Sequence, residues 1–280
     1  MRKRSAEWLA YFRGNADRPP PPVDASEAEA IAPALREALV RSLGRFYLGE
    51  TGEGRIAHEA ARSGDPALDA LMCESIVLYV REEGRHARGL AGALAALGAT
   101  LPERHYSEAL FRRARRLMGL RTKMMTIAVA EIIGLAYYEL LAEHVPAVAG
   151  LALALARDER EHLAFQAEYF ARVIEARATG GGVEGGCVAA QLRGGVIGAG
   201  YAAIVACAIA LLVVDHSSLI RELRVTRADL ALRCVRSAWS GVEACRALLR
   251  EPRPLETVIA SPPETKARAV RYGRAEVHAS

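Results

Sequence analysis

Apolar residues recur at alternating steps of three and four along four long segments of the chain, which is the spacing of one face of an α-helix. This pattern predicts helices over about residues 33–62, 66–97, 118–143 and 147–177. Hydrophobic residues make up 51% of the chain but aromatic residues only 6%, and alanine, leucine and arginine dominate, which favours helix over sheet. We therefore expect an all-α fold.

Turn and breaker residues divide the chain into four parts. Residues 1–32 form an N-terminal segment, in which a short amphipathic helix precedes a proline-rich linker, and residues 33–178 hold the four long helices. Five glycines between Thr179 and Gly186 separate these from additional C-terminal helices over residues 187–250, expected to pack on the bundle. The tail, residues 251–280, contains four prolines and few apolar residues, so we expect it to be disordered.

The charge and cysteine content exclude some classes of protein. The net charge is only +4, and the arginines are scattered along helices, so no nucleic-acid surface is expected. Five cysteines without a Cys-x-x-Cys pair indicate a reducing compartment. The basic N-terminus is not followed by an apolar run of signal-peptide length, so a cytoplasmic protein is expected.

An uncharged run of 21 residues extends from Gly194 to Val214. Its length and apolarity are sufficient for a transmembrane helix. Its many alanines and glycines also suit tight packing between protein helices. We expect a buried helix, with membrane association as the alternative.

Two Glu-x-x-His motifs interrupt the apolar stripes of the second and fourth long helices. Glu83 and His86 fill two vacancies in the stripe of one helix, and Glu159 and His162 do so in the other. Residues three apart share one helix face, so each motif directs a carboxylate and an imidazole inward. A carboxylate in such a stripe is costly unless it is paired or bound to a metal.

Two further glutamates lie on the apolar stripes of the first and third long helices. Glu50 precedes Glu83 by 33 residues and Glu131 precedes Glu159 by 28, separations that fit helical hairpins. Four carboxylates and two imidazoles suit two divalent ions such as iron or manganese, and the acids also neutralise their charge. Glu53 competes with Glu50 for this role, and Glu139 competes with Glu131 from a more polar side of its helix.

The motifs carry a resemblance to a known superfamily. Glu-Glu-Gly-Arg-His at 82–86 and Asp-Glu-Arg-Glu-His at 158–162 resemble the paired motifs of ferritin-like di-iron carboxylate proteins, including the soluble acyl-carrier desaturases. Gly49-Glu50-Thr51 is similar to a Gly-Glu-Ser in the first helix of rubrerythrin. The resemblance covers about residues 35–175 and implies a ferritin-like four-helix bundle. It implies the metal ligands Glu50, Glu83, His86, Glu131, Glu159 and His162, with Glu83 and Glu131 as the bridging carboxylates.

Several residues are expected to surround these ligands. By the same resemblance, Glu82 and Asp158 stand where neighbouring acids orient the ligand histidines. Tyr47 and Tyr138 lie within two turns of the ligands and either hydrogen-bond a carboxylate, hold a radical or serve as packing aromatics. Gln166 is a candidate for a pocket wall. The other histidines are expected at the surface or at helix ends: His58, His105, His144, His216 and His278.

The chain also differs from the protein families that it resembles. It has no Cys-x-x-Cys rubredoxin module, unlike rubrerythrin, and the desaturases are longer with a different interhelical spacing. Leu155 stands where the related amine N-oxygenases carry an extra histidine, which argues against that subclass.

Together these features imply an enzyme, a non-haem di-iron oxidoreductase. Two iron ions, with manganese or a mixed pair as alternatives, would activate dioxygen to hydroxylate, desaturate or cleave a small apolar organic substrate. Electrons would come from a separate ferredoxin or reductase, since no motif for an electron-carrying cofactor occurs in the chain. The alternatives are a peroxide-scavenging or iron-handling protein and a membrane-attached redox protein. A homodimer is compatible with the sequence. The sequence does not specify the substrate, the native metal pair or the oligomeric state.

Overall fold

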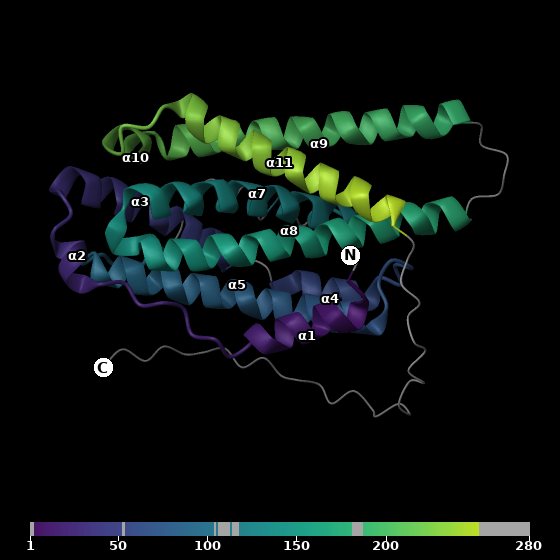
Figure 1. The fold of residues 1–280 in the computed structure, drawn as a ribbon, viewed down its shortest axis with the longest axis horizontal. Helices are drawn as coiled ribbons and strands as arrows, with labels where there is room; N and C mark the ends of the chain where they lie inside the picture. The colour runs from purple at the N-terminus through teal and green to yellow at the C-terminus, as the bar shows by residue number, and fades with distance from the viewer. Residues whose placement is uncertain are drawn as a thin grey trace.

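The computed structural model describes residues 3–51, 54–103, 105, 113, 118–180 and 187–251, and these residues form helices and no strand. The expected all-α class is confirmed (Figure 1). In chain order the helices are α1 (Ser5–Asn15), α2 (Ala25–Glu29), α3 (Pro33–Glu50), α4 (Gly54–Arg62), α5 (Ala70–Ala96), α7 (Leu120–His144), α8 (Pro146–Gly180), α9 (Cys187–Asp215), α10 (Ser217–Glu222) and α11 (Arg227–Arg250). The tail beyond residue 251, expected to be disordered, lies outside the described residues.

The helices α3, α5, α7 and α8 form a bundle in which α7 and α8 are an antiparallel hairpin. The chain reverses at Val145, and Pro146 begins α8, a position where the missing N–H of proline costs nothing. Two hydrophobic clusters fill the bundle. The first contains Leu39, Leu90, Leu94, Tyr138, Leu151 and Leu155, and the second contains Trp8, Phe12, Met72, Tyr79, Phe165 and Tyr169. Along α5, α7 and α8, the Glu-x-x-His motifs and Glu131 occupy the segment between these two clusters.

The first long helix expected from the sequence is two helices in the structure. α3 ends at Glu50, and α4 begins at Gly54, so the prediction of one helix over residues 33–62 is wrong. The physical reason lies in three glycines at positions 49, 52 and 54, since glycine has low helix propensity. The Thr51 hydroxyl donates to the Leu48 carbonyl and so helps to close the end of α3.

Other helix ends follow the residues that the sequence offers. α5 begins four residues later than expected because the Asp69 side chain accepts a hydrogen bond from the Met72 N–H and caps the helix there. It ends before Gly98, whose φ of +73° is a conformation that glycine adopts without strain. Thr226 caps α11, because its hydroxyl accepts a hydrogen bond from the Asp229 N–H at the start of that helix.

The N-terminal segment contributes to the core. α1 packs against α5, and Trp8, Leu9 and Phe12 are buried beneath it. The rings of Phe12 and Phe165 meet edge to face, with centroids 5.1 Å apart. Figure 1 shows this purple helix alongside α5 at one edge of the bundle.

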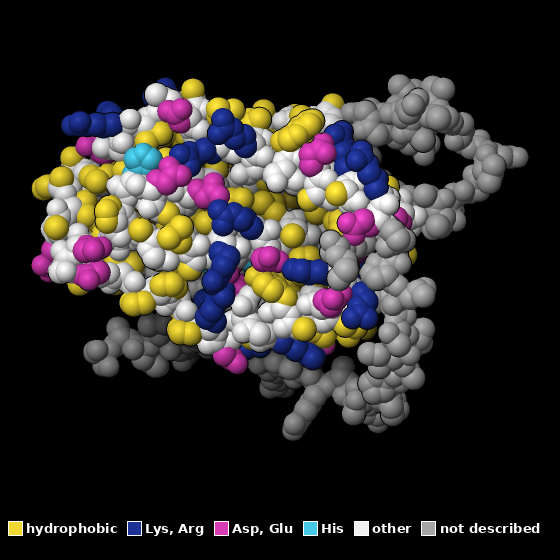
Figure 2. Space-filling view, viewed as in Figure 1, with side chains coloured by type: hydrophobic (Ala, Val, Ile, Leu, Met, Phe, Trp, Pro, Cys, Tyr) yellow, Lys and Arg dark blue, Asp and Glu magenta, His cyan; other side chains and the backbone are white. Residues whose placement is uncertain are grey.

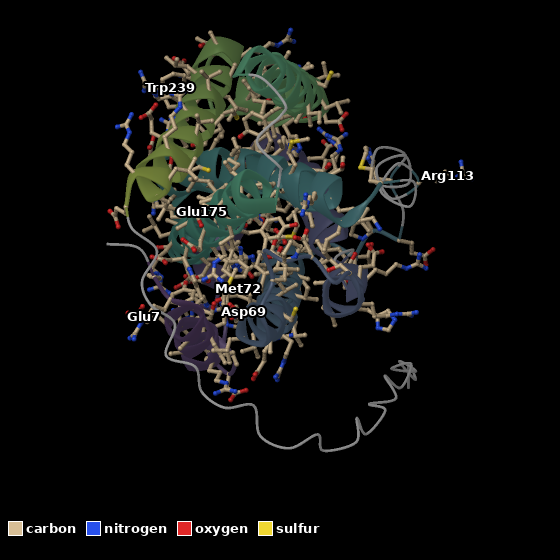
Figure 3. All side chains as sticks on the ribbon, turned by 90° about the vertical axis from the view of Figure 1, so that its right-hand side faces the viewer. Glu7, Asp69, Met72, Arg113, Glu175 and Trp239 are labelled. Atoms are coloured by element: carbon tan, nitrogen blue, oxygen red, sulfur yellow. The ribbon has the colours of Figure 1, made fainter. Side chains whose placement is uncertain are left out.

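α9 and α11 lie on the opposite side of α7 and α8 from α1 and α5, as the end-on view in Figure 3 shows. α9 packs by one face only. Val205 and Leu212 are buried against the bundle, whereas Leu211 is 52% and Val214 is 67% exposed. The expectation of a buried helix is therefore wrong for the outer face of α9. On α11, Trp239 also points outward and is exposed.

Two described helices are long and apolar enough to cross a membrane. The first, α7, is 83% buried over its apolar window, as expected for a core helix. The second window, Gly198–Asp215 of α9, is only 11% buried. On the face of the molecule seen in Figure 2, charged side chains of both signs are interspersed, in agreement with the scattered arginines of the sequence.

Candidate metal centre

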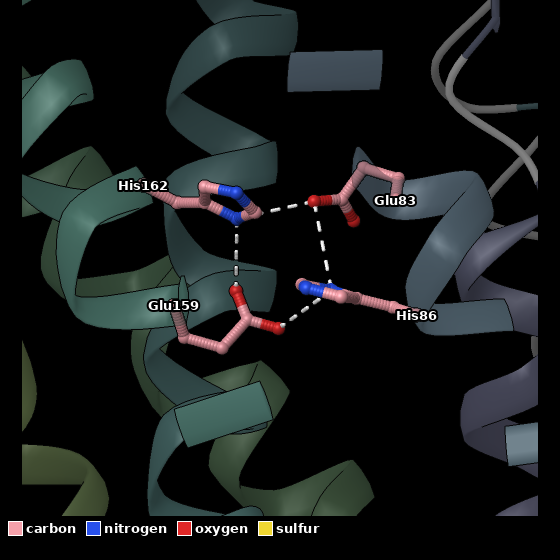
Figure 4. Close-up of side chains that lie close together, drawn as sticks. All are labelled: Glu83, His86, Glu159 and His162. Carbon is pink, nitrogen blue, oxygen red and sulfur yellow. Dashed lines mark hydrogen bonds and ion pairs between the residues drawn. The ribbon is translucent and has the colours of Figure 1, made fainter. Parts of the chain in front are cut away.

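Two Glu-x-x-His pairs face each other inside the bundle. Glu83 and His86 come from α5, and Glu159 and His162 come from α8 (Figure 4). All four side chains are buried, and one potential ligand atom from each lies within 4.8 Å of the others. The i, i+3 spacing places each pair on the inner face of its helix. This group could hold a metal ion.

The two imidazoles present the same nitrogen to the carboxylates. The His162 Nδ1 atom lies 3.1 Å from Glu83 Oε1 and 3.3 Å from Glu159 Oε2. The His86 Nδ1 atom lies 3.6 Å from Glu159 Oε1 and 3.9 Å from Glu83 Oε1. Each carboxylate therefore lies between both histidines, as the dashed lines in Figure 4 show.

The outer nitrogens of the two rings contact the acids that precede each motif glutamate. His162 Nε2 lies 3.3 Å from Glu82 Oε2, and His86 Nε2 lies 3.5 Å from Asp158 Oδ2. The pairing is crossed, because the acid from each motif contacts the histidine of the other. Such contacts fix the orientation of a ligand imidazole and leave its second nitrogen free to bind.

The remaining expected ligands join the same group. Glu50 Oε2 lies 3.9 Å from His86 Nδ1, and Glu131 Oε2 lies 3.7 Å from His162 Nδ1. Tyr138 donates a hydrogen bond of 2.8 Å to Glu50 Oε1, while Tyr79 donates one to Glu131 Oε1. The structure thus brings all six sequence-predicted ligands together.

Not every candidate belongs to this group. Tyr47 is partly buried and packs against the first hydrophobic cluster. Glu139 forms an ion pair with Arg160 at 2.5 Å near the surface, as expected of a solvated charge. Glu53 lies outside the described residues, and it is Glu50 that the structure places beside His86. Gln166 donates a 3.4 Å hydrogen bond to Glu131 Oε1.

Two arginines were not anticipated from the sequence. The buried Arg85 donates to Asp158 Oδ2 at 2.8 Å and also to Glu82, so one guanidinium links the two outer acids. Arg18 donates to Asp158 Oδ1 at 2.7 Å. The i, i+3 spacing of Glu82 and Arg85 is a signal that could have identified Arg85. Arg18 lies in the linker after α1, where no periodicity points to it.

The electrostatics of the cluster are those of closely spaced acids. Burial, followed by the charges of Glu131 and Glu50, raises the pKa of Glu83 well above its usual value. Burial and the charge of Glu131 raise the pKa of Glu159 in the same way. Burial opposes the charged form of His162, but its hydrogen bonds with the surrounding carboxylates outweigh burial and raise its pKa well above the usual value. The cluster therefore retains protons in the absence of a metal.

Other acids of the cluster remain ionised. Burial alone would raise the pKa of Glu131, but its hydrogen bonds with Glu159, His162 and Tyr79 lower it to about 2. Burial is likewise outweighed at Asp158, where contact with His86 and the charges of Arg85 and Arg18 lower the pKa.

The donor atoms fit a divalent metal. Glu83 Oε1 and His86 Nδ1 lie 3.9 Å apart, are buried and make no hydrogen bond among the described residues. A buried polar atom without a partner is unfavourable, and a cation between these two atoms would satisfy both. Carboxylate oxygens combined with imidazole nitrogens suit iron or manganese.

A cavity of about 280 Å³ adjoins the cluster and is bordered by α3, α7 and α9. The carboxylates of Glu50, Glu83, Glu131 and Glu159 line one part of it. The rest of the wall is mostly aliphatic. The four acids therefore border a space whose other walls are largely apolar.

A second buried polar group lies nearby and is of a different kind. The Ser42 hydroxyl lies 2.6 Å from the Tyr137 hydroxyl and 2.6 Å from His216 Nδ1. The Phe46 ring stacks on Tyr137 with centroids 4.0 Å apart. His216 lies at a helix end, as expected, because it is the residue that precedes α10. Its side chain makes no capping hydrogen bond and is buried, so the expectation of a surface or capping side chain is wrong. Burial, together with the charge of Arg45, lowers its pKa to about 3, so this imidazole is neutral.

In comparisons with protein-family models, curated protein sequences and solved structures, no significant match to this chain was found.

Proposed function

We propose that this chain is a ferritin-like di-metal carboxylate protein that binds two iron ions and uses dioxygen to oxidise a small apolar organic substrate. The observation that carries the proposal is the crossed pairing, in which each histidine directs Nδ1 toward the carboxylates and Nε2 toward an outer acid. A chance cluster of interior acids would not be expected to orient both imidazole rings with Nδ1 toward the carboxylates and Nε2 toward an outer acid.

The distribution of the ligands over the helices supports the same proposal. α3 and α7 each supply one glutamate, Glu50 and Glu131, and α5 and α8 each supply a Glu-x-x-His pair. This is the scheme of di-iron and di-manganese carboxylate bundles. Manganese or a mixed pair remains the alternative to iron, because the same donors accept both.

When bound, the two ions would supply the redox chemistry and act as Lewis acids. The protein's own residues supply the geometry. Glu82 orients the imidazole of His162, and Asp158 orients that of His86. Tyr79 donates a hydrogen bond to Glu131, and Tyr138 donates one to Glu50. The hydrophobic clusters would exclude water from the two ends of the centre along the bundle. Electrons would come from a separate ferredoxin or reductase.

A peroxide-scavenging or iron-handling protein is the main rival. Such a protein needs no space for an organic molecule beside its ligands. The largely aliphatic cavity that reaches Glu50, Glu83, Glu131 and Glu159 favours oxidation of an organic substrate instead.

A membrane-attached redox protein is the second candidate, and the outward face of α9 is the observation that favours it. Attachment in the plane of the membrane would keep the contacts of Val205 and Leu212 with the bundle, whereas a span across it would remove them. Expression without detergent tests this candidate. Recovery of the protein with the membrane fraction would support it, and recovery as a soluble species in low and high salt would overturn it.

Oxygen consumption tests the proposed chemistry. The iron-loaded protein, reduced chemically, should consume dioxygen faster when an apolar compound from a panel of aromatic and aliphatic hydrocarbons is added. Glu159→Gln should lower that rate by about 100-fold or more, since even indirect partners of a metal contribute 10–100-fold. Glu161→Gln is the matched control, because Glu161 lies two residues away on α8 and pairs with Lys3 near the surface. Equal rates in the two variants would refute an oxidising centre here. Rapid loss of hydrogen peroxide without any organic compound would favour the scavenger.

A further inference from the structure

The cavity beside the cluster has one wall that does not belong to the four bundle helices. Ile204, Ala208 and Leu212 of α9 line it, opposite residues of α3 and α7. The α7 side is formed mainly by Ile127, Val129, Ala130, Ile133 and Gly134. α9 therefore forms one wall of this space, which stays open to solvent and has the exposed Leu211 on its rim.

The charges around the cavity do not favour a charged ligand. Arg45 and Asp215, of opposite sign, both lie on its wall together with the neutral His216. On the cluster side, four carboxylates would be balanced by two divalent ions. Neither a cationic nor an anionic head group gains a net opposite charge, whereas the aliphatic side chains favour an uncharged apolar body.

The volume limits the size of the ligand. An apolar cavity of about 150 Å³ holds one benzene molecule. The space of about 280 Å³ is roughly twice as large, so it suits two fused aromatic rings or an aliphatic molecule of similar volume.

Gly134 lies between the cavity and the cluster. A Cβ atom at this position would lie 3.4 Å from Glu159 Oε1 and 3.5 Å from Tyr138 Cε2. One methyl group fits there in ordinary contact, but a branched side chain would extend into the passage toward Glu159. On the facing wall, Ala208 is likewise small, while Ala206 of the same helix is exposed on the outer face.

We infer that this cavity binds an uncharged apolar compound of about two fused rings, and that Gly134 and Ala208 set the size it accepts. The identification of this compound as the substrate rests on the proposed function. Its binding does not, because the cavity walls need no redox step to hold an apolar molecule.

Naphthalene is a suitable probe. Its binding to the iron-loaded protein under argon, where no turnover occurs, can be followed by equilibrium dialysis and by its fluorescence. We expect saturable binding at one site per chain. Its carboxylate analogue, 2-naphthoate, should bind at least about tenfold more weakly, because a desolvated charge costs well over 1.4 kcal/mol. Equal or tighter binding of 2-naphthoate would overturn the inference.

Two matched variants locate the site. Ala208→Phe should weaken naphthalene binding by at least tenfold, whereas Ala206→Phe, on the opposite face of α9, should leave it unchanged. Ala208→Leu is a smaller replacement if Ala208→Phe does not fold, and Gly134→Val should also weaken binding while two irons per chain are retained. Unchanged naphthalene binding in a folded Ala208 variant would overturn the inference. If the protein binds naphthalene but retains no iron, the inference that the cavity binds an apolar compound stands and the proposed function is refuted.

Discussion

Two buried histidines, His162 of α8 and His216 between α9 and α10, have opposite electrostatic surroundings. His162 is surrounded by carboxylates of Glu82, Glu83 and Glu159, and its pKa is raised. His216 contacts the hydroxyl of Ser42 and the ring of Tyr137, and its pKa is lowered to about 3. Both side chains are buried, so burial alone does not mark a functional histidine. The partners decide whether the ring is charged.

The two groups also differ in completeness. In the second group, the Ser42 hydroxyl links Tyr137 and His216 at 2.6 Å each, and its polar atoms satisfy one another. In the first group, Glu83 Oε1 and the nitrogens of His86 make no hydrogen bond within the described part of the chain, and the acids outnumber the imidazoles. The polar atoms of the second group are paired within the protein, whereas the first group has buried donor atoms without a hydrogen bond that could hold a metal ion.

The largest expected effect is that of metal on stability. Iron(II) should raise the free energy of unfolding by about 5 kcal/mol when its free concentration is 100 times the dissociation constant at both sites, since each site contributes about 2.7 kcal/mol. Urea unfolding under argon, with and without iron, measures this difference. His216→Phe should show the same gain from iron as the unaltered protein. If iron or manganese leaves the unfolding midpoint unchanged, the claim that only the first group binds metal is contradicted.

Replacement of His216 has the next largest effect, and it is purely structural. His216→Ala should lower the stability by about 2–4 kcal/mol, because it leaves a void and removes one of the two partners of the Ser42 hydroxyl. The number of irons retained per chain should not change. Urea unfolding combined with metal analysis checks both statements, and a loss of iron would mean that the two groups are coupled.

A smaller effect is expected from pH on the metal-free protein. The folded-state pKa values of Glu83, Glu159 and His162 are raised, so the folded state binds more protons than the unfolded state. The stability that the two glutamates contribute falls as pH rises above about 4.5, and the stability that His162 contributes falls as pH rises above about 6.5. Glu131 and Asp158 have lowered pKa values, so their contribution is lost as pH falls below about 4.5.

The metal-free protein should therefore be most stable in mildly acidic solution. Iron competes with protons for the same ligands, so the gain in stability from iron should increase with pH. Urea unfolding between pH 5 and pH 8 with and without iron tests the signs. A metal-free stability that rises over this range would contradict the assignment of raised pKa values.

The smallest effect is expected at two glycines within the bundle. Gly134→Ala should stabilise the metal-free protein by up to about 1 kcal/mol, because alanine favours helix and its Cβ fits beside Glu159. Gly89→Ala should not stabilise, since its Cβ would lie 2.8 Å from Leu151 Cδ1 and 3.1 Å from Pro20 Cβ. Thermal unfolding compares the two. Stabilisation by Gly89→Ala, or destabilisation by Gly134→Ala, would show that the packing around them differs from that described.

The sequence predicts the all-α class and the convergence of the six acids and imidazoles, because both depend on helical periodicity within single segments. Glu83 and His86, for example, complete a stripe that is visible in the sequence. The crossed contact of Glu82 with His162 depends on the rotation of α5 relative to α8, which no local pattern contains.

Other features depend on partners far away in the chain. His216 is buried because Ser42, 174 residues earlier, lies beside it, and Arg18 reaches Asp158 from a linker. The outward face of α9 could not be predicted either, since a uniformly apolar helix has no polar stripe to indicate its exposed side. Periodicity identifies the apolar and polar faces of single helices, whereas tertiary contacts determine which side chains from distant parts of the chain meet and which faces stay exposed.

The central claim is that the acid-rich group binds a pair of metal ions, and X-ray absorption on the iron(II)-loaded protein tests it most directly. We expect about two irons per chain, bound by oxygen and nitrogen, with an iron–iron distance of about 3.5–4 Å, as in other two-metal sites. Glu83→Ala should remove the iron–iron signal, and Glu161→Ala should not. A single isolated iron per chain, or a spectrum that Glu83→Ala leaves unchanged, would contradict the account.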